Sequence, residues 1–443
     1  MIPRTSAGSA KAAVITSTTK RRQSCAEHES RYTYWMDLQA KLSVLADAAK
    51  YDASCASSGS TRKDSSGGRG IGSTGGTGIC HSYAPDGRCI SLLKILLTNF
   101  CIYDCLYCIN RISSNVARAR FTADEVVKLT LDFYSRNYIE GLFLSSGIIR
   151  DADYTMEQLV SVARKLREEH DFRGYIHLKT IPDASDDLSA QAARYADRVS
   201  VNVELPTEDS LSQLAPEKNA QSIKRSMAHL REQIDAAKDE ARTFANAPKC
   251  APAGQSTQMI VGADDATDQA IIEKSATLYS SYRLKRVYYS AFSPISDSSK
   301  LLPVRPAPLI REHRLYQTDW LLRFYGFQHQ EIFERTDGML DLEIDPKLAW
   351  ALKHREQFPV DLNKAPREQL LRVPGLGSKA VERIISARKL RTIHVEDLSK
   401  LHVPVKRVLP FVKALGHTNS RALDSKSLEG TLRREPQQLG LWA

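Results

Sequence analysis

Short apolar runs alternate with amphipathic stretches along residues 91–300. The amphipathic stretches repeat their apolar residues every three or four positions, as helices do, whereas the apolar runs are short, as in buried strands. The runs predict strands at Leu92–Thr98, Gly141–Ser145, Tyr175–Lys179, Val199–Val203, Gln258–Val261 and Val287–Phe292. The stretches between them predict helices near Ala123–Arg136, Met156–His170, Asp187–Ala196, Ser222–Ala241 and Ala266–Tyr282. Six strands alternating with helices favour an α/β fold, in which a parallel sheet curls into an open or closed barrel with its ligand site at the carboxyl ends of the strands.

The chain on either side of this region follows other patterns. Residues 1–30 predict a disordered N-terminal tail, and residues 31–90 predict a helix at Trp35–Ala49 followed by a Gly/Ser-rich stretch at Ser54–Gly78. That stretch suits a flexible linker or a loop that wraps a phosphate or cofactor. Three prolines within Leu301–Pro308 mark a domain edge, and a helical connector follows over 301–355, with a helix through Arg311–Tyr325. Residues 356–416 predict a small all-α domain of short helices around a tight turn, and residues 417–443 predict a flexible polar tail.

The composition is that of a folded cytoplasmic protein. The 443 residues are 42% hydrophobic and 26% charged, which is ordinary for globular domains. The sequence has no uninterrupted apolar run of membrane-spanning length, and its first 24 residues lack the compact apolar segment of a secretory signal. We therefore expect a cytoplasmic location and no membrane partner.

Positive charge is concentrated towards the C-terminus. The whole chain has a formal net charge of +10, and residues 351–443 alone hold 18 Lys and Arg against 9 Asp and Glu. A local surplus of this kind indicates a module that binds a polyanion, although a solvated basic helical face gives the same count.

Three cysteines lie close together after the first predicted strand of the barrel. Cys101, Cys105 and Cys108 follow that strand at C-x3-C-x2-C spacing, at the end of the strand where catalytic loops lie in such folds. Three thiolates can hold three irons of a cubane cluster and leave the fourth iron open, whereas a closed structural site takes four protein ligands. The alternatives are a zinc site completed by a distant residue and a chance run of core cysteines.

This loop resembles the signature of the radical S-adenosylmethionine (radical SAM) superfamily, including the aromatic Tyr107 before the last cysteine. The resemblance implies a partial (β/α)6 TIM-like barrel, a [4Fe–4S] cluster on the three cysteines, and S-adenosylmethionine (SAM) bound to the open iron. It also implies that one electron from the cluster splits SAM into methionine and a 5′-deoxyadenosyl radical, which abstracts a substrate hydrogen. An electron donor such as flavodoxin or ferredoxin would supply the electron.

The resemblance also suggests a SAM pocket. Ser145, Ser146 and Gly147 end the second strand, where the family has a Gly-Gly-Glu-type motif for the methionine amino group. This chain has no acid there, so the serine hydroxyls or backbone carbonyls would take that role. The remaining positions are Lys179, Asn202 and Glu204, for the carboxylate or ribose, and Gly262, for adenine. Ordinary polar and turn residues at strand ends give the same pattern, and no residue is assigned a catalytic role.

Further cysteines precede the cluster loop. Cys55, Cys80 and Cys89 could hold a second metal together with His81, but their long irregular spacing favours structural or loop roles.

A second motif lies in the basic region, with Val373-Pro374-Gly375-Leu376-Gly377 at its centre. A helix ends at the proline, the two glycines make a tight turn, and a new helix begins near Ser378, which exposes backbone amides as an anion site. The motif resembles a helix-hairpin-helix DNA-binding motif, which contacts the sugar-phosphate backbone with little base reading. The expected contacts are Pro374, Gly375, Leu376, Gly377, Lys379 and Arg383. A protein-docking helical pair is the alternative.

The sequence predicts a degenerate second copy of the motif from Val395 to Val408, without the hairpin glycines. We expect this copy to pack against the first one and not to bind phosphate.

From about Tyr34 to about Lys413 the chain is similar to a bacterial family described as DNA modification or repair radical SAM proteins. The shared pieces are Lys50-Tyr51-Asp52, Asp86-Gly87-Arg88-Cys89, the cluster loop, Asp345-Pro346-Lys347 and the hairpin. The similarity implies a DNA substrate and a protein partner that resembles a uracil-DNA glycosylase. We therefore expect a radical SAM enzyme that acts on a DNA base or lesion. The alternatives are a radical SAM enzyme that modifies RNA or a protein, and a non-enzymatic iron–sulfur DNA-binding redox sensor.

Overall fold

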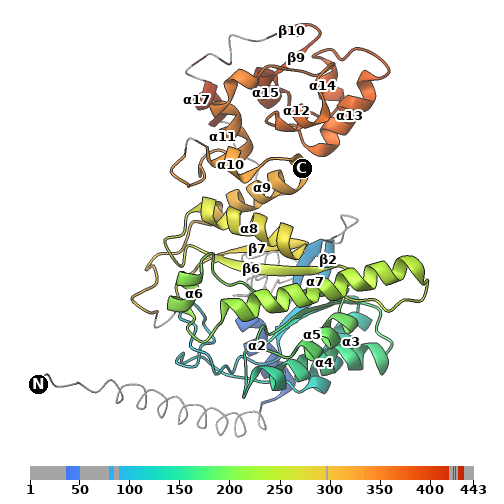
Figure 1. Cartoon of the computed structure of the whole chain (residues 1–443), viewed down its shortest axis with the longest axis vertical. Helices are drawn as coiled ribbons and strands as arrows, with labels where there is room; N and C mark the ends of the chain where they lie inside the picture. Colours follow the sequence, from blue (N-terminus) through green and yellow to red (C-terminus); the bar gives the residue numbers. More distant parts are fainter. Residues whose placement is uncertain are drawn as a thin grey trace, which may run out of the picture. The chain divides into compact units, whose positions relative to one another are not determined.

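The computed structural model describes residues 36–49, 79–83, 89–295, 298–334, 336–418, 423, 425 and 428–433. The chain divides into two compact units (Figure 1). The sheet unit comprises Met1–Asp264 and Leu278–Pro306, and the C-terminal unit comprises Asp265–Thr277 and Ala307–Ala443. The expected tail at 1–30, the stretch Ser54–Gly78 with Cys55, and most of the tail at 417–443 lie outside the described residues.

The described residues of the sheet unit form a seven-stranded sheet in the order β1-β2-β3-β4-β5-β6-β7. Its strands are β1 Ile79–Tyr83, β2 Cys89–Leu96, β3 Gly141–Ser145, β4 Tyr175–Lys179, β5 Arg198–Ser200, β6 Gln255–Val261 and β7 Arg286–Ala291. Strands β2 to β7 pair in parallel, which confirms the six predicted strands, and β1 adds an antiparallel edge to β2. The edge strand was missed because its five residues hold too few apolar positions to show a period.

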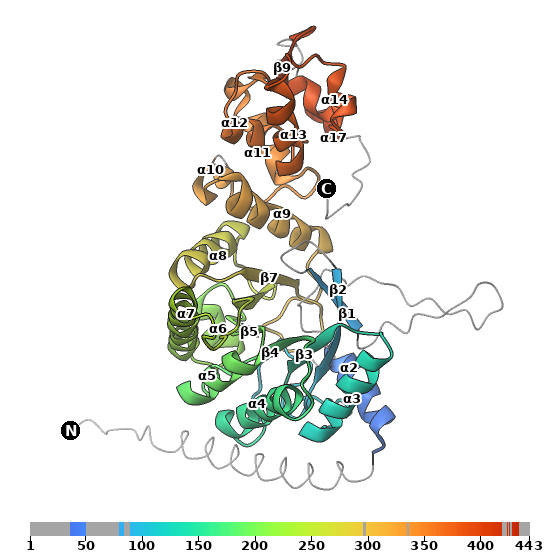
Figure 2. The ribbon, with the colours of Figure 1, turned by 90° about the vertical axis from the view of Figure 1, so that its right-hand side faces the viewer.

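Helices connect the strands and lie on the outer face of the curled sheet, as Figure 2 shows for α3, α4, α5 and α7. The helices of this region are α2 Leu38–Ala49, α3 Ala123–Ser135, α4 Ala152–Glu168, α5 Asp186–Tyr195, α6 Glu208–Leu214, α7 Ala220–Thr243 and α8 Asp268–Tyr282. Several begin at a side-chain cap; Thr122, for example, caps α3 in a capping box with Glu125. Such a cap stabilises a helix start by about 1 kcal/mol.

Polar side chains on alternate positions of the strands face the inside of the curl. His177 of β4 hydrogen-bonds Ser200 of β5, whose hydroxyl lies 2.8 Å from the Ser256 hydroxyl of β6. Burial holds the pKa of His177 well below its usual value, so the imidazole is neutral. Because the strand period is two, Lys179 and Gln258 face the same side, nearer the carboxyl ends of their strands. The sheet therefore has a polar interior that leads towards those ends.

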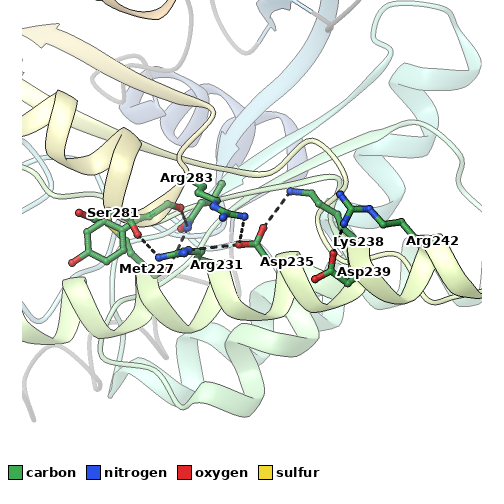
Figure 3. A network of polar contacts seen from close by, with 10 residues as sticks. Met227, Arg231, Asp235, Lys238, Asp239, Arg242, Ser281 and Arg283 are labelled. Atoms are coloured by element: carbon green, nitrogen blue, oxygen red, sulfur yellow. Dashed lines mark hydrogen bonds and ion pairs between the residues drawn. The ribbon is translucent and has the colours of Figure 1, made fainter. Parts of the chain in front are cut away.

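Charged side chains of α7 contact the C-terminal end of α8 and the residue that follows it, Arg283, on the sheet unit's surface (Figure 3). Arg231 donates to the carbonyl of Ser281 at 2.7 Å, and Asp235 pairs with Arg283 at 3.0 Å. The pairs are largely exposed, so each stabilises the fold by less than about 1 kcal/mol.

The C-terminal unit consists mainly of short helices. Its elements are α9 Leu309–Tyr325, α10 His329–Phe333, α11 Pro346–Lys353, η1 Arg355–Gln357, β8 Val360–Asp361, α12 Arg367–Arg372, α13 Ser378–Arg388, α14 Asp397–Lys400, α15 Val405–Val408, η2 Leu409–Phe411, β9 Val412–Ala414, β10 His417–Thr418 and α17 Leu428–Arg433. Its core holds Phe327 packed edge-on against Trp350, and Phe358 against Phe411. No helix in the described part of the chain is long and apolar enough to cross a membrane.

The all-α prediction for residues 356–416 needs a correction, because β8, β9 and β10 form a small three-stranded sheet. Strand β8 pairs in parallel with β9, which pairs antiparallel with β10. These strands are only two or three residues long, too short for an alternating pattern to appear in the sequence.

Candidate functional site: a cysteine-lined pocket and a basic hairpin

A pocket opens at the carboxyl ends of strands β3 to β6, beside the loop that carries the three cysteines. Its accessible volume is about 200 Å³. Its polar lining residues are Cys101, Tyr103, Cys105, Tyr107, Cys108, Asn110, Ser145, Ser146, Lys179, Thr180, Asp183, Asn202, Glu204, Lys218, Asn219 and Gln258.

The pocket brings together nearly all the residues that the sequence assigned to the cluster and SAM. Cys101, Cys105, Cys108, Tyr107, Ser145, Ser146, Gly147, Lys179, Asn202 and Glu204 all line it. Gly262 follows β6 with a φ of 77° and is not among the lining residues. Two lining residues that the sequence did not indicate are Lys218, which adds a buried ammonium group, and Gln258, which adds a side-chain amide.

The loop that carries the cysteines is held by its own backbone and by Arg118. The Cys108 amide donates to the Cys105 carbonyl at 2.9 Å, and the Tyr103 amide donates to the Cys101 sulfur at 3.5 Å. The Arg118 guanidinium donates to carbonyls near both ends of the loop, those of Asn99, Asn110, Arg111 and Ser114. The thiols therefore sit on a loop whose ends are fixed by one cation.

The three cysteines carry free thiols, with Cys105 buried and the other two partly exposed. Burial raises the pKa of Cys108 to about 11 and also raises the pKa of Cys105. The thiols of Cys105 and Cys108 are therefore neutral until a metal replaces their protons.

Three cysteines on one loop are a donor set that suits a [4Fe–4S] cluster. Among the described residues, no group of three or more His, Cys, Asp or Glu side chains converges on a point where one metal ion would sit. A [4Fe–4S] cluster does not need such convergence, because each cysteine binds a different iron. The buried hydroxyl of Ser145 also has no hydrogen-bond partner among the described residues, which suits a wall that meets a polar ligand.

A buried ion pair also lines the pocket. Lys218, which precedes α7, pairs with Glu204, which follows β5, and both side chains are largely buried. Burial lowers the pKa of Lys218, but the attraction of Glu204 and of nearby Cys105 outweighs it, so the net shift is upward. Glu204 keeps a left-handed backbone, with a φ of 64°, because its amide and carbonyl bridge to β6 at Gln258 and Ile260. The pair thus brings a fixed cation close to the cysteines.

Amide and ammonium groups of three neighbouring residues also line the pocket: Lys179 of β4, Asn202 after β5 and Gln258 of β6. The Gln258 side-chain oxygen lies 3.5 Å from both the Lys179 ammonium and the Asn202 amide nitrogen. Such groups can donate to and accept from the carboxylate, ribose or base of a bound ligand.

Gly147 lets the chain after β3 approach the cysteine loop. Its amide donates to the Thr98 carbonyl at 2.8 Å. A Cβ at this position would lie 2.3 Å from the Phe100 carbonyl oxygen and 3.3 Å from the Cys101 Cβ.

We expect Gly147→Ala to displace the cysteine loop, and to lower the iron bound per chain and SAM cleavage by about ten-fold or more, as changes next to metal ligands do. Iron analysis after anaerobic reconstitution measures the effect. Gly430→Ala is the matched control, because a Cβ there meets nothing within 4 Å. Wild-type iron content in Gly147→Ala would show that the close approach is not needed.

Cysteines outside the loop do not form a second site in the described residues. Cys80 is buried in a cluster with Ile90, Leu92 and Phe143, which supports a structural role. Cys89 belongs to β2, and Cys55 lies outside the described residues.

The C-terminal unit holds the predicted hairpin. Helix α12 ends at Arg372, Gly375 turns with a φ of 85°, and α13 begins at Ser378 without a side-chain cap. A Cβ on Gly375 would lie 3.0 Å from Val408 and 3.2 Å from Pro404, so the turn packs against these two residues.

The six expected DNA contacts differ in their surroundings. Pro374 and Leu376 are buried and support the turn, whereas Lys379 is exposed at the start of α13. Arg383 donates to the Leu401 carbonyl at 2.9 Å and to the His402 carbonyl at 3.5 Å, so its guanidinium is partly used inside the unit. The exposed groups of the hairpin are therefore the backbone around Gly375 and Gly377, and Lys379.

A buried lysine supports the turn from within. The Lys347 ammonium donates to the Leu376 carbonyl at 2.6 Å and lies 4.6 Å from the centre of the Tyr325 ring. Burial holds the pKa of Lys347 well below its usual value. Lys347 thus holds the Leu376 carbonyl towards the interior of the unit.

Comparison with known proteins identifies the sheet unit. Residues 95–241, which include the three cysteines and strands β3 to β5, match the radical SAM superfamily. No curated protein matches the chain.

Similar solved structures include HydG, described as a maturase of the [FeFe]-hydrogenase, with 12% identity and a TM-score of 0.38 over 50% of this chain and 46% of that one. HydG from Carboxydothermus hydrogenoformans has 14% identity and a TM-score of 0.39 over 50% and 48%. OxsB, a cobalamin-dependent S-adenosylmethionine radical enzyme with aqua-cobalamin bound, has 8% identity and a TM-score of 0.29 over 45% and 32%. The chain spans about half the length of the HydG structures.

The family match covers the cysteine loop and strands β3 to β5 of the pocket wall, and the curled α/β sheet is the fold that the sequence resemblance implied. The chain therefore carries, over residues 95–241, a domain of the radical SAM superfamily, whose enzymes cleave S-adenosylmethionine by means of a [4Fe–4S] cluster.

Proposed function

We propose that this radical SAM enzyme acts on DNA and that its C-terminal hairpin holds the sugar-phosphate backbone. The observation that carries the proposal is the hairpin itself. Gly375 adopts a left-handed turn that presents the uncapped N-terminus of α13, and Lys379 is exposed beside it. Backbone amides at a helix start together with a lysine bind phosphate through charge and hydrogen bonds, without reading sequence.

The pocket residues take complementary roles in this proposal. Cys101, Cys105 and Cys108 hold the cluster, which supplies the electron that cleaves SAM when both are bound. Ser145, Ser146 and the backbone at Gly147 bind the methionine end of SAM, and Lys218 offers a cation to its carboxylate, a role that the sequence had given to Lys179, Asn202 or Glu204. Lys179, Asn202 and Gln258 form the remaining polar wall for ribose or substrate.

A base in a duplex must leave the stack to reach a pocket of this kind, at a cost of a few kcal/mol that is least at damaged or mismatched sites. The basic surplus of residues 351–443 supports a polyanionic partner, as does the sequence resemblance to DNA modification or repair radical SAM proteins. That resemblance also suggests a protein partner similar to a uracil-DNA glycosylase. Reduction of the cluster requires an electron donor, such as flavodoxin or ferredoxin.

Charge reversal at the hairpin tests the DNA proposal. We expect Lys379→Glu to weaken binding of any DNA sequence and to reduce the slope of log K against log salt by about one, because one phosphate contact is lost. Lys389→Glu is the matched control, since Lys389 is exposed at the other end of α13. Fluorescence anisotropy with labelled DNA at several salt concentrations provides the measurement.

A second experiment on the reconstituted enzyme identifies the class of substrate. Mass spectrometry of DNA, RNA and protein after anaerobic turnover would identify the modified molecule. DNA binding that is equal in wild type and Lys379→Glu, or turnover-dependent modification of RNA alone, would overturn the proposal.

A further inference from the structure

Helix α9 of the C-terminal unit presents two aromatic rings to solvent. Trp320 and Phe324 are four residues apart, on one face of the helix, with their ring centres 4.3 Å apart. Their exposed fractions are 43% and 44%, which is high for side chains of this size. The Arg323 guanidinium lies 4.8 Å from the centre of the Phe324 ring and pairs with Asp319 at 3.2 Å. The face thus combines two rings with a positioned cation.

This aromatic face adjoins the hairpin within the same unit. Tyr325, the last residue of α9, lies against the Trp320 side chain and the backbone of Ser378. Burial raises the pKa of Tyr325, and hydrogen bonds with these two groups partly oppose that rise. The Tyr325 ring also faces the Lys347 ammonium, which donates to the carbonyl of Leu376 in the turn. One tyrosine therefore links the exposed indole to the first residue of α13, where the hairpin presents its amides.

Exposed aromatic rings beside a phosphate-binding turn suit a nucleobase. A base that stacks on a tryptophan or phenylalanine contributes about 1–3 kcal/mol, whatever its identity, because every base has a π face. A base inside a duplex already has a neighbour on each face, so only an unpaired or extruded base can stack on the protein. The Arg323 guanidinium beside the Phe324 ring favours a nucleic acid over an apolar protein surface.

We propose that Trp320 and Phe324 stack on unpaired bases of the strand whose phosphates the hairpin holds, so that the enzyme selects DNA with single-stranded or unstacked segments over intact duplex. This inference rests on the proposed DNA function and narrows its substrate to DNA that already contains an opened segment.

Binding of three labelled DNA molecules by the full chain tests the inference: a 20-nucleotide single strand, the matching duplex, and the duplex with a three-nucleotide bulge. Wild type should bind the single strand and the bulged duplex more tightly than the intact duplex. The double variant Trp320→Ala with Phe324→Ala should lose about ten-fold or more in affinity for the first two and little for the duplex.

Two further variants separate stacking from structure. Trp320→Phe with Phe324→Tyr keeps both rings and should keep the preference. Leu390→Ala removes an apolar side chain that is 88% exposed at the end of α13, and should bind all three DNA molecules as wild type does. Circular dichroism melting checks that each variant is folded.

The outcomes distinguish this inference from the DNA function itself. If the alanine variant keeps the wild-type preference while Lys379→Glu weakens all binding, the hairpin binds DNA and the stacking inference is wrong. If wild type binds none of the three molecules, the DNA function fails, and the stacking inference with it. If the alanine substitutions instead change the oligomeric state in size-exclusion chromatography and leave DNA binding unchanged, the aromatic face is an interface between copies of the chain, which also overturns the inference.

Discussion

Cys105→Ala is expected to abolish the formation of 5′-deoxyadenosine and the visible absorption of the iron–sulfur cluster. Cys105 is buried at the centre of the cysteine loop, and its removal leaves one iron of the cluster without its protein ligand. Cys101→Ala and Cys108→Ala should behave in the same way, because in the proposed cluster each thiolate holds a different iron. Iron and sulfide analysis after anaerobic reconstitution, followed by chromatography of the products formed with SAM and dithionite, measures both effects.

Cys250→Ala is the control for these variants. Cys250 also has a free thiol, but it lies before β6 and away from the lining of the pocket. It should keep the wild-type iron content and nucleoside yield. If Cys105→Ala still forms 5′-deoxyadenosine, Cys105 is not a ligand of the cluster and another residue must hold that iron.

Glu204→Gln is expected to lower the free energy of unfolding of the sheet unit by about 3–5 kcal/mol. The substitution leaves the Lys218 ammonium in a largely buried place without its counter-charge. A lone buried charge is costly because the interior solvates it poorly, whereas the pair nearly offsets its own desolvation. Urea unfolding of the protein without its cofactors, followed by circular dichroism at pH 7, measures the change.

The double variant Glu204→Gln with Lys218→Met tests whether the unpaired charge is the cause. It removes both charges and should recover most of the lost stability, because a hydrophobic replacement for a buried pair is often neutral or stabilising. A single variant within about 1 kcal/mol of wild type would indicate that water reaches Lys218 and that the pair is not desolvated.

The sequence was most informative where one local pattern determines the structure. Strands β3 and β4 were predicted with the bounds that the structure has, because each is a short apolar run between polar segments. The cysteine loop was predicted from spacing alone, since ligands that share one tight loop need no distant partner. The hairpin was predicted from the two glycines, and the φ of 85° at Gly375 shows why one of them is needed.

Features that depend on long-range contacts could not be predicted in this way. Lys218 lies in a polar turn and resembles a surface residue until the fold places it against Glu204. Arg118 shows no pattern in the sequence, yet its guanidinium holds carbonyls at both ends of the cysteine loop. Arg383 was expected at the DNA surface from its spacing, but the second copy of the motif takes up part of its guanidinium. In each case the partner is distant in the sequence.

The central claim is that three thiolates in the pocket hold a cluster with one iron left open to SAM. Electron paramagnetic resonance of the reduced, reconstituted protein, recorded before and after addition of SAM, tests it most directly. The account predicts about four iron and four sulfide ions per chain and a spectrum that changes when SAM binds the open iron. Bound zinc in place of iron, or a cluster whose spectrum is indifferent to SAM, would contradict it.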